Sequence, residues 1–474
     1  MSLPELIEIV PLEKPIHAEI TVPGSKSITN RALILAALAE GEVALQGALW
    51  SEDTQIMVEC LQELGFMVNV DPDPNESCNR TITVYGKGGV IPPGGTEQQP
   101  LELFVGNAGT AARFLSAFVC LGKGVYRLHG VPRMHERPQA ALFKALRELG
   151  YRIESENQND KLPVKIHGSR RGVEVDQSAR NEDRLLTSAA TVSIEESSQF
   201  ASALLLSAKT GNWEITITGE NAEESPYVAM TAKLIETFPK QGGKFQIEPD
   251  ASSGSYFLGA GWLFLAECSP EAENEDTSIR RFETDFMARV TDERKLGSVL
   301  LRDWPSSNWQ IDEKFPSTLS RPSLVTSPAT ISRNGGLGDS IMTAIILAPF
   351  IGNPARFTDL GRLRVQECER VSALRTELTK CGAKIIEEGD TLTVFPSELH
   401  GAEIETYSDH RMAMCFSILG LKVPGIKIKN PACVKKTFPN FFQKLAALPP
   451  NGLGATILDA KTGRKLSHDE LFAD

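Results

Sequence analysis

Side chains that can bind an anion gather at the start of an apolar segment near the beginning of the sequence. A Pro-Gly turn delivers Ser25, Lys26 and Ser27 to the first turn of a predicted helix that runs to about Ala39. The free backbone N–H groups and the positive dipole end of a helix N-terminus favour a phosphate or a carboxylate. Lys26 adds a mobile cation, and Arg31, about one turn later, can hold a planar anion with two parallel hydrogen bonds. The spacing therefore indicates an anion site.

A second interpretation of this stretch stays open. A capped helix with solvated charges would use the same residue types, because serine and asparagine are common N-caps. A Walker loop is excluded, since GxxxxGK[ST] requires glycine directly before the lysine and Ser25 stands there.

The same pattern, a polar loop that leads into an apolar helix, occurs six times along the chain. The five further stretches are 103–113, 195–206, 249–258, 336–344 and 407–414. One junction in roughly 79 residues indicates internal repetition. A second helix with a glycine stop recurs as well, at Leu64-Gly65, Leu149-Gly150 and Cys381-Gly382. We infer a repeated strand–helix–strand–helix–strand–strand unit.

Packing of such units has a consequence for binding. If the apolar helices lie parallel and buried, their N-termini emerge on one face of a domain and favour anions there. At any single junction, Ser, Asp or Asn could serve only as an N-cap. Six junctions are harder to explain in that way because they also hold Lys26, Arg31, Gln199, Asp339, His410 and Arg411.

Three charged stretches lie outside this pattern. Residues 133–137 form a predicted arginine-rich loop before a helix that begins near Pro138. Glu367 and Arg370 lie near the first turn of a further predicted helix, and Lys436 precedes another. Alone, each stretch would more often be a solvated charge cluster than a site.

The composition is that of a globular protein with more than one domain. The chain has 474 residues, more than a single core usually holds. A formal net charge of −12 disfavours nucleic acid and anionic membranes as partners, so local cations must attract any anionic ligand. Residues 1–10 lack the pattern of a secretory signal, and the apolar runs are too short to cross a bilayer. The eight cysteines form no CxxC pair and the seven histidines no ligand cluster, which predicts a cytoplasmic protein without a metal.

Several motifs occur in the order found in a known family. They are Pro23-Gly-Ser-Lys-Ser, Gly106-Asn-Ala-Gly-Thr-Ala, Pro132-Arg-Met-His-Glu-Arg-Pro, Ser197-Ser-Gln-Phe, Asp250-Ala-Ser-Ser, Asp409-His-Arg-Met-Ala-Met and Lys436-Thr-Phe-Pro. On these residues the sequence resembles the 5-enolpyruvylshikimate-3-phosphate synthases, from about residue 10 to about residue 447. The match thins between residues 267 and 333, where we expect an acidic surface insertion at 267–276 and no helical periodicity after residue 301.

The resemblance implies an α/β (α+β) fold, a two-lobed inside-out α/β barrel. Each lobe would hold three βαβαββ units with buried parallel helices. One lobe would be residues 23–248, on the shikimate 3-phosphate side. The other would be residues 1–22 with 249–448, and the two lobes would close on each other. Residues 449–474 would form a C-terminal tail with no site that we can assign.

The resemblance also implies a reaction, the transfer of the enolpyruvyl group of phosphoenolpyruvate to the 5-hydroxyl of shikimate 3-phosphate. Phosphate leaves through a tetrahedral intermediate, on the route to chorismate and the aromatic amino acids. Protonating the methylene carbon and taking a proton from the hydroxyl requires an acid–base pair and fixed cations, and no cofactor or metal in principle. Asp339 matches the carboxylate that contacts the attacking hydroxyl, and Glu367 matches the proposed proton donor. With Lys26 they are the implied catalytic residues.

The implied binding residues fall into two sets. Shikimate 3-phosphate would be held by Lys26, Ser27, Arg31, Ser197, Ser198, Gln199, Tyr227, Asp339 and Gln366. Phosphoenolpyruvate would be held by Lys26, Asn107, Gly109, Thr110, Arg137, Gln199, Arg370, His410, Arg411 and Lys436. We expect a monomer whose partners are these two small molecules, with glyphosate competing for the phosphoenolpyruvate pocket beside Gly109.

The sequence departs from the family pattern at three positions. Gln366 stands where lysine is usual, Arg362 where asparagine is usual, and Glu224 where serine is usual. These departures motivate one alternative, a non-catalytic or altered-substrate paralogue that binds phosphorylated ligands. Retention of both Asp339 and Glu367 argues against it. The related UDP-N-acetylglucosamine enolpyruvyl transferase is a second alternative, but that enzyme typically carries a reactive cysteine where this loop reads Arg133-Met-His-Glu-Arg137.

Overall fold

The computed structural model describes residues 3–14, 17–168, 188–219, 225–264, 295–296, 299–320 and 328–473. By their internal contacts the residues divide into two units. We call Gly24–Ile247 the central unit, and Met1–Pro23 with Glu248–Asp474 the terminal unit. The predicted acidic insertion at 267–276 and the departure at Glu224 lie outside the described residues.

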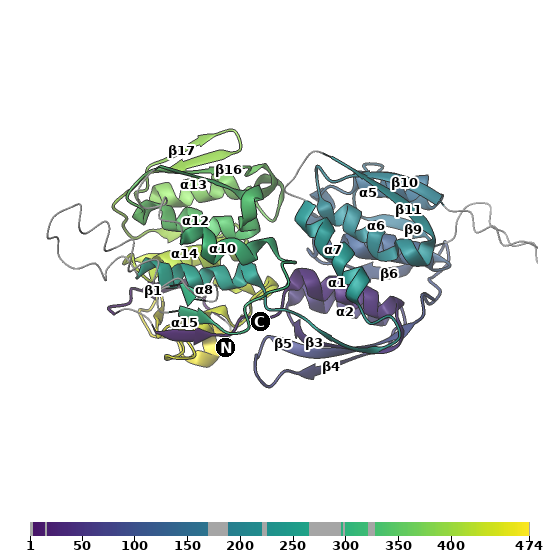
Figure 1. Ribbon diagram of the computed structural model, residues 1–474, viewed down its shortest axis with the longest axis horizontal. Helices are drawn as coiled ribbons and strands as arrows, with labels where there is room; N and C mark the ends of the chain where they lie inside the picture. Colours follow the sequence, from purple (N-terminus) through teal and green to yellow (C-terminus); the bar gives the residue numbers. More distant parts are fainter. Residues whose placement is uncertain are drawn as a thin grey trace, which may run out of the picture. The chain divides into compact units, whose positions relative to one another are not determined.

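The strands of the central unit form two four-stranded sheets and one parallel pair within its described part (Figure 1). They are β3 (Glu40–Leu49), β4 (Val68–Pro72), β5 (Asn79–Lys87), β6 (Leu101–Phe104), β7 (Val125–His129), β8 (Arg152–Ser155), β9 (Val164–His167), β10 (Ser188–Ser193), β11 (Trp213–Thr218) and β12 (Gly243–Gln246). The strand orders are β12-β3-β5-β4, β6-β7-β9-β8 and β10-β11. Each four-stranded sheet begins with a parallel pair and continues with two antiparallel pairs.

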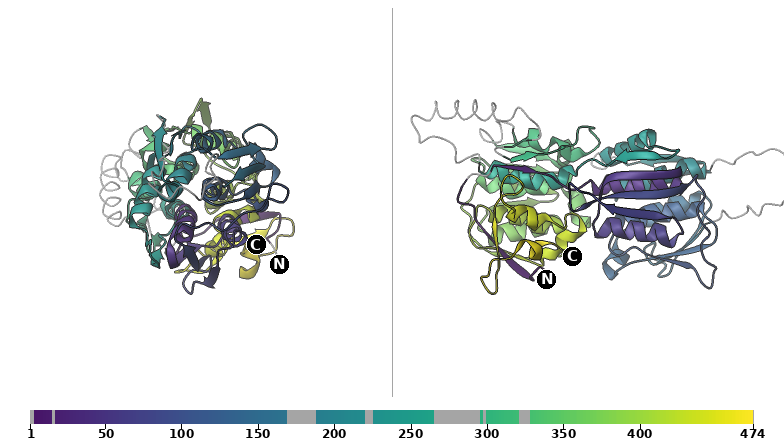
Figure 2. Two further views of the ribbon diagram at one scale, coloured as in Figure 1. Left: turned by 90° about the vertical axis from the view of Figure 1, so that its right-hand side faces the viewer. Right: turned by 90° about the horizontal axis from the view of Figure 1, so that it is seen from below.

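Three helices of the central unit contact one another and form its core: α1 (Lys26–Leu38), α3 (Gly109–Phe118) and α6 (Ser198–Gly211). Every residue of α3 is buried, including the polar Thr110, Arg113 and Ser116. Strands β3 and β5 pack on α1, and the purple strands lie over the purple helix in the right-hand view of Figure 2. The remaining helices are α2 (Glu52–Glu63), α4 (Pro132–Glu136), α5 (Ala140–Glu148), α7 (Ser225–Thr237) and the 3-10 turn η1 (Val119–Leu121).

The terminal unit repeats this plan. Its strands are β1 (Leu6–Val10), β2 (Ala18–Ile20), β13 (Lys295–Leu296), β14 (Val299–Leu301), β15 (Ala329–Ser332), β16 (Ala355–Thr358), β17 (Ile385–Glu388), β18 (Thr391–Val394), β19 (Glu403–Ile404), β20 (Ile426–Lys429) and β21 (Thr456–Asp459). The described strands pair in the orders β15-β16-β18-β17, β19-β20-β1-β21 and β13-β14-β2. Both chain ends therefore contribute strands to one sheet, and residues after 449 pack as part of this unit.

Three helices again contact one another in the core: α8 (Ala251–Leu263), α12 (Ile341–Leu347) and α14 (His410–Gly420). All thirteen residues of α8 are buried. Other helices are α10 (Phe315–Leu319), α13 (Arg370–Lys380) and α15 (Phe441–Ala446). Short turns are η4 (Ile311–Lys314), η5 (Arg333–Leu337), η6 (Gly338–Ser340), η7 (Ala348–Phe350), η8 (Gly361–Val365), η9 (Pro431–Lys436) and η10 (His468–Leu471).

The predicted α/β fold and its repeated unit are confirmed. The successions β6-α3-β7-α5-β8-β9 and β15-α12-β16-α13-β17-β18 have the same order, and their sheets have the same strand order. Each of the six polar junctions leads into a different one of the six core helices. Glycine follows the outer helices as predicted, with φ of 87°, 93° and 95° at Gly65, Gly150 and Gly382.

Two local predictions are wrong. Residues 133–136 form part of helix α4 instead of a loop, because Pro132 occupies its first position, where a proline costs no hydrogen bond. Helix α5 consequently begins at Ala140 and not near Pro138. The stretch after residue 301, for which the sequence predicts no helical periodicity, contains η4 and the one-turn helix α10. Among the described helices, none has the length and apolar character needed to cross a bilayer.

Candidate active site

Lys26, the first residue of α1, forms an ion pair with a buried aspartate. Its Nζ lies 2.9 Å from Oδ2 of Asp53, which is in the first turn of α2. The Asp53 side chain is 4% exposed, whereas that of Lys26 is 20% exposed. The lysine therefore balances a buried negative charge while its own side chain stays partly exposed.

Arg31, also on α1, is held by hydroxyls and a carbonyl. Its Nε donates to Oγ1 of Thr231 at 2.7 Å, and its Nη2 donates to Oγ of Ser202 at 3.0 Å. Its Nη1 donates to the carbonyl of Ser27 at 2.9 Å, and the guanidinium lies 5.2 Å from the ring centroid of Phe114. Burial lowers the pKa of Arg31 to about 10, because the charged form loses hydration. A nearby anion would offset that loss.

The start of α3 brings two arginines against a glycine. Arg113 Nη1 donates to Oε1 of Gln199 at 2.6 Å, and Arg137 Nη1 donates to the carbonyl of Asn107 at 3.1 Å. A methyl group on Gly109 would lie 2.7 Å from Nη2 of Arg137 and 2.8 Å from Nη1 of Arg113. An alanine at this position would therefore require the ends of both arginine side chains to move.

Gln199 links the starts of two core helices. Its Nε2 donates to Oγ1 of Thr110 on α3 at 3.2 Å, while its backbone N–H donates to Oγ of Ser197, the N-cap of α6. Ser198 follows as the first residue of α6. Tyr227 lies on α7, and its carbonyl accepts a hydrogen bond from Thr231 at 2.8 Å.

Arg370, the first residue of α13, lies at the centre of a buried ionic cluster in the terminal unit. Its side chain is 1% exposed, and Nε and Nη2 donate to the two carboxylate oxygens of Asp409 at 2.7 and 3.3 Å. Nη2 also donates to Glu367 at 2.9 Å, and Nη1 donates to the side-chain oxygen of Gln366. Burial alone would lower the pKa of Arg370, but Asp409, Glu367 and Asp339 outweigh it and raise the pKa.

Asp339, in the turn η6, is surrounded by three arginines. Arg333 Nη2 lies 3.1 Å from Oδ1, while Arg411 Nε and Arg370 Nη1 lie 3.2 and 3.7 Å from Oδ2. Burial would raise the pKa of Asp339, but the charges of Arg411, Arg370 and Arg333 lower it well below its usual range. The carboxylate is therefore ionised at neutral pH.

Glu367 lies between two cations, with Oε1 at 3.1 Å from Lys436 Nζ and Oε2 at 2.9 Å from Arg370 Nη2. His410, the buried first residue of α14, has its Nδ1 3.7 Å from Oδ1 of Asp409. Each carboxylate of the cluster thus contacts at least one cation. This arrangement can bind an anion by exchange, because a phosphate or carboxylate can replace a protein carboxylate beside the same arginine or lysine.

The clusters also contain residues that the sequence does not predict to belong to the site. Asp53, Arg113, Arg333, Asp409 and Asp312 are the counter-ions or supports of predicted residues. Asp409 stands inside a quoted motif and Arg113 inside the junction stretch 103–113, so the position of each is a usable signal. Asp53 and Asp312 make contacts that no local pattern indicates.

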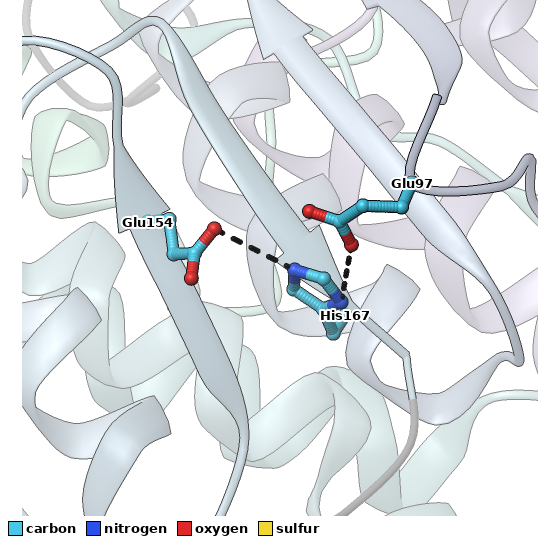
Figure 3. A group of neighbouring side chains, drawn as sticks. All are labelled: Glu97, Glu154 and His167. Carbon is cyan, nitrogen blue, oxygen red and sulfur yellow. Dashed lines mark ion pairs between the residues drawn. The ribbon is translucent and has the colours of Figure 1, made fainter. Parts of the chain in front are cut away.

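A separate group of side chains on the central unit could be mistaken for a metal site. Within the described residues, Glu97, Glu154 and His167 are the one set whose ligand atoms lie close enough to share an ion. His167 Nδ1 lies 3.7 Å from Glu97 and Nε2 lies 3.8 Å from Glu154 (Figure 3). Arg152 already contacts both carboxylates, at 2.5 Å from Glu154 and 3.9 Å from Glu97. We interpret the group as a surface ion-pair network between β8, β9 and the loop before β6.

Comparison with known proteins identifies the family. The family model described as EPSP synthase (3-phosphoshikimate 1-carboxyvinyltransferase) matches residues 10–268 and 308–445. The 3-phosphoshikimate 1-carboxyvinyltransferase of Trichormus variabilis is 35% identical over 459 residues, covering 93% of this chain and 98% of its relative. The enzyme of the same name from Opitutus terrae is 35% identical over 490 residues, covering 96% of this chain and 100% of its relative.

Solved structures agree on the fold. The EPSP synthase of Acinetobacter baumannii superposes with a TM-score of 0.62 at 20% identity, covering 95% of this chain and 99% of that one. The enolpyruvyl transferase NikO of Streptomyces tendae superposes with a TM-score of 0.59 at 16% identity, covering 98% and 99%. The predicted two-lobed α/β fold is thereby confirmed. From its sequence motifs, its fold and these relatives, the chain belongs to the EPSP synthase (3-phosphoshikimate 1-carboxyvinyltransferase) family.

Proposed function

We propose that the two clusters described above carry the binding and acid–base groups of the family's reaction in this chain. That reaction transfers the enolpyruvyl group of phosphoenolpyruvate to the 5-hydroxyl of shikimate 3-phosphate and releases phosphate. The observation that carries the proposal is the placement of Asp339 and Glu367 beside one shared arginine, Arg370. Two carboxylates in different ionic surroundings can divide the roles of acid and base.

In the central unit we assign the sugar phosphate to the residues near Arg31. The proposed contacts are Lys26, Ser27, Arg31, Ser197, Ser198, Gln199 and Tyr227. Support comes from the buried Arg31, which has hydroxyls and a carbonyl around its guanidinium and gains from an anion. Lys26, Asn107, Gly109, Thr110 and Arg137 are assigned to phosphoenolpyruvate, since Gly109 allows the arginines to approach the start of α3.

In the terminal unit we assign Arg370, His410, Arg411 and Lys436 to the binding of phosphoenolpyruvate. An anion that draws Arg370 and Lys436 away from Glu367 removes the charges that favour its ionised form, and so favours a proton there. That change suits Glu367 as the donor to the methylene carbon. Asp339 also contacts Arg333, which is not assigned to the anion, so its carboxylate stays ionised and is suited to accept a hydrogen bond from the attacking hydroxyl.

Two of the positions that depart from the family pattern, Gln366 and Arg362, act on shikimate 3-phosphate in this proposal. The side-chain oxygen of Gln366 accepts a hydrogen bond from Arg370, so Gln366 belongs to the ionic cluster around Arg370. A lysine at this position would instead add a positive charge to that cluster. We propose that the cation at Arg362, on η8, replaces that charge from a different backbone position. The cytoplasmic location and the monomeric state stay predictions, and sedimentation at 51.7 kDa would test the latter.

The assay that tests the function measures phosphate release with both substrates and with each one alone. We expect release only with both, competition by glyphosate against phosphoenolpyruvate, and a kcat lower by about 10²–10⁴-fold in Asp339→Asn and Glu367→Gln with an unchanged circular dichroism spectrum. Phosphate that appears no faster with both substrates than with one would contradict the proposal.

A further inference from the structure

The buried carboxyl of Asp312, which lies in none of the family motifs, supports the turn that carries Asp339. Asp312 lies on η4 and is 5% exposed. Its Oδ1 accepts the backbone N–H of Ser340 at 2.7 Å, and Ser340 directly follows Asp339. A hydrogen bond of this length, formed away from water, fixes the backbone of η6.

The turn is shaped around that carboxyl. Gly338 has φ of +50° and ψ of −126°, a conformation that side chains disfavour. A methyl group placed there would lie 2.7 Å from Oδ2 of Asp312 and 2.6 Å from Cγ2 of Ile311. Glycine therefore lets the backbone before Asp339 wrap closely around the Asp312 side chain.

The other side of η4 holds the start of α8. Gln310, the residue before η4, accepts the backbone N–H of Ala251 with Oε1 at 3.0 Å and donates with Nε2 to the carbonyl of Pro249 at 2.8 Å. Gln310 is itself held by Glu313 in a capping box. The turn η4, with the residue before it, thus contacts both the beginning of the core helix α8 and η6, the turn that precedes α12.

Both tied segments contact the same arginine. Arg411 donates to Oγ of Ser252 at 3.1 Å and to the hydroxyl of Tyr256 at 3.2 Å, both on α8, and its Nε lies 3.2 Å from Asp339. A shift of η6 relative to α8 would therefore change the contact between Asp339 and Arg411.

We infer that Asp312 is a positioning residue, whose carboxyl holds the turn Gly338–Ser340 and so fixes Asp339 against its arginines. The inference rests on the proposed function, because it matters for turnover only if Asp339 contacts the attacking hydroxyl. A change in the contact between Asp339 and Arg411 would displace the Asp339 carboxylate from the attacking hydroxyl. Small displacements of reacting groups strongly lower the reaction rate.

The experiment compares Asp312→Ala and Asp312→Asn in the full chain. Asparagine keeps an oxygen that can accept the Ser340 N–H, whereas alanine removes it. We expect Asp312→Ala to lower kcat by about tenfold to a hundredfold with KM values changed less, and Asp312→Asn to recover most of that loss. Hydrogen exchange of the Ser340 amide should become faster in Asp312→Ala and stay slow in Asp312→Asn.

Glu377 offers a matched control. It is also fully buried in the terminal unit and accepts hydrogen bonds from Lys380, Tyr407 and the backbone of Glu405. It makes no such contact with η6. Glu377→Ala should lower the melting temperature and leave kcat per folded enzyme unchanged. If Asp312→Ala behaves in the same way, with normal kcat and slow Ser340 exchange, the positioning role is refuted.

The variant Asp339→Asn, assayed in parallel, distinguishes a failure of the proposed function from a failure of the positioning role of Asp312. Normal turnover in Asp339→Asn would refute the proposed role of Asp339, and with it the reason for positioning that residue. Loss of turnover in Asp339→Asn with normal turnover in Asp312→Ala would refute only the positioning role. Should Asp312→Ala fail to fold, Gly338→Ala replaces it, since its methyl would displace the same carboxyl, and normal kcat in that variant would equally refute the inference.

Discussion

At the scale of single residues, the candidate site consists of charges that stabilise one another before any ligand arrives. Lys26 and Asp53 form one such pair, and Arg370 with Asp409 forms another in which both members are almost fully buried. Removing one member of a buried pair leaves an uncompensated charge, which typically costs about 3–5 kcal/mol. Variants of these residues therefore change stability and activity together, and the two effects have to be separated by design.

At Lys26 the effect of a substitution on stability can be measured separately from its effect on activity. Lys26→Ala should abolish most turnover and also lower the melting temperature, because Asp53 loses its cation. The double variant Lys26→Ala with Asp53→Asn should recover stability by removing the buried charge, and it should stay inactive if Lys26 binds substrate. Thermal unfolding and phosphate release measure the two effects. Recovery of turnover in the double variant would show that Lys26 acts only on Asp53.

Asp312 predicts a dependence of stability on pH. Burial first, and then the charges of Asp339 and Asp250, raise the pKa of Asp312 to about 7, against the opposing effects of Arg411 and the Ser340 N–H. An unfolded aspartate has a pKa near ~3.9, so the folded chain binds the extra proton between these values. The stabilisation is present below about pH 4 and is lost as the pH rises through about 7.

Asp312→Asn lacks this titration. The free energy of unfolding of the wild type minus that of the variant should therefore fall between pH 5 and pH 8, measured by urea denaturation. A difference that stays constant or grows with pH would be inconsistent with a raised pKa at this position.

At the scale of elements, the site is built from helix starts. Asp409 shows how one residue serves both structure and site: its Oδ1 accepts the backbone N–H of Arg411 as the N-cap of α14, while both of its oxygens hold Arg370. Ser197 caps α6 and at the same time orients Gln199. Capping and ligand binding, treated as alternatives at the level of sequence, are thus compatible in one side chain.

Gly109 at the start of α3 gives a prediction at this scale. Gly109→Ala would place a methyl group against the guanidiniums of Arg113 and Arg137. Since these side chains must move, we expect the KM for phosphoenolpyruvate to rise by about tenfold or more, in line with a loss of about 1.4 kcal/mol per factor of ten. The KM for shikimate 3-phosphate serves as the internal control and should change less. Equal KM values for wild type and variant would remove Gly109 from the pocket.

At the scale of the whole molecule, some features could be predicted from sequence and others could not. The six core helices are predictable because a polar cap and an apolar run are local signals, and the ends of α2, α5 and α13 are predictable because a glycine stop is one too. The pairing of β1 with β20 and β21 joins segments from the two ends of the chain, and the contact of Asp312 with Ser340 depends on packing, so neither leaves a local pattern. The charged residues 133–137 favour a loop at the level of sequence, but Pro132 marks a helix start and helix α4 forms there.

The central unit is continuous in sequence, which predicts that it folds alone. Its first and last strands pair, since β12 lies beside β3 and the N–H of Ile247 donates to the carbonyl of Gln46 at 2.9 Å. A fragment 24–247 should show helical circular dichroism and a cooperative thermal transition. A fragment ending at residue 239, which lacks β12, should melt at a lower temperature. Equal melting of the two, or no cooperative transition in the longer one, would contradict this expectation.

The separation in sequence between β1 and its partners also bears on how the protein is made. During synthesis at about 5–20 residues per second, β1 leaves the ribosome roughly 20–80 seconds before β20 does. Ile7 and Ile9, both fully buried at the end, stay without their partners for that whole interval. The nascent chain therefore exposes the apolar side chains of β1 throughout the synthesis of the central unit and beyond it, and a chaperone that binds apolar segments would be most useful there.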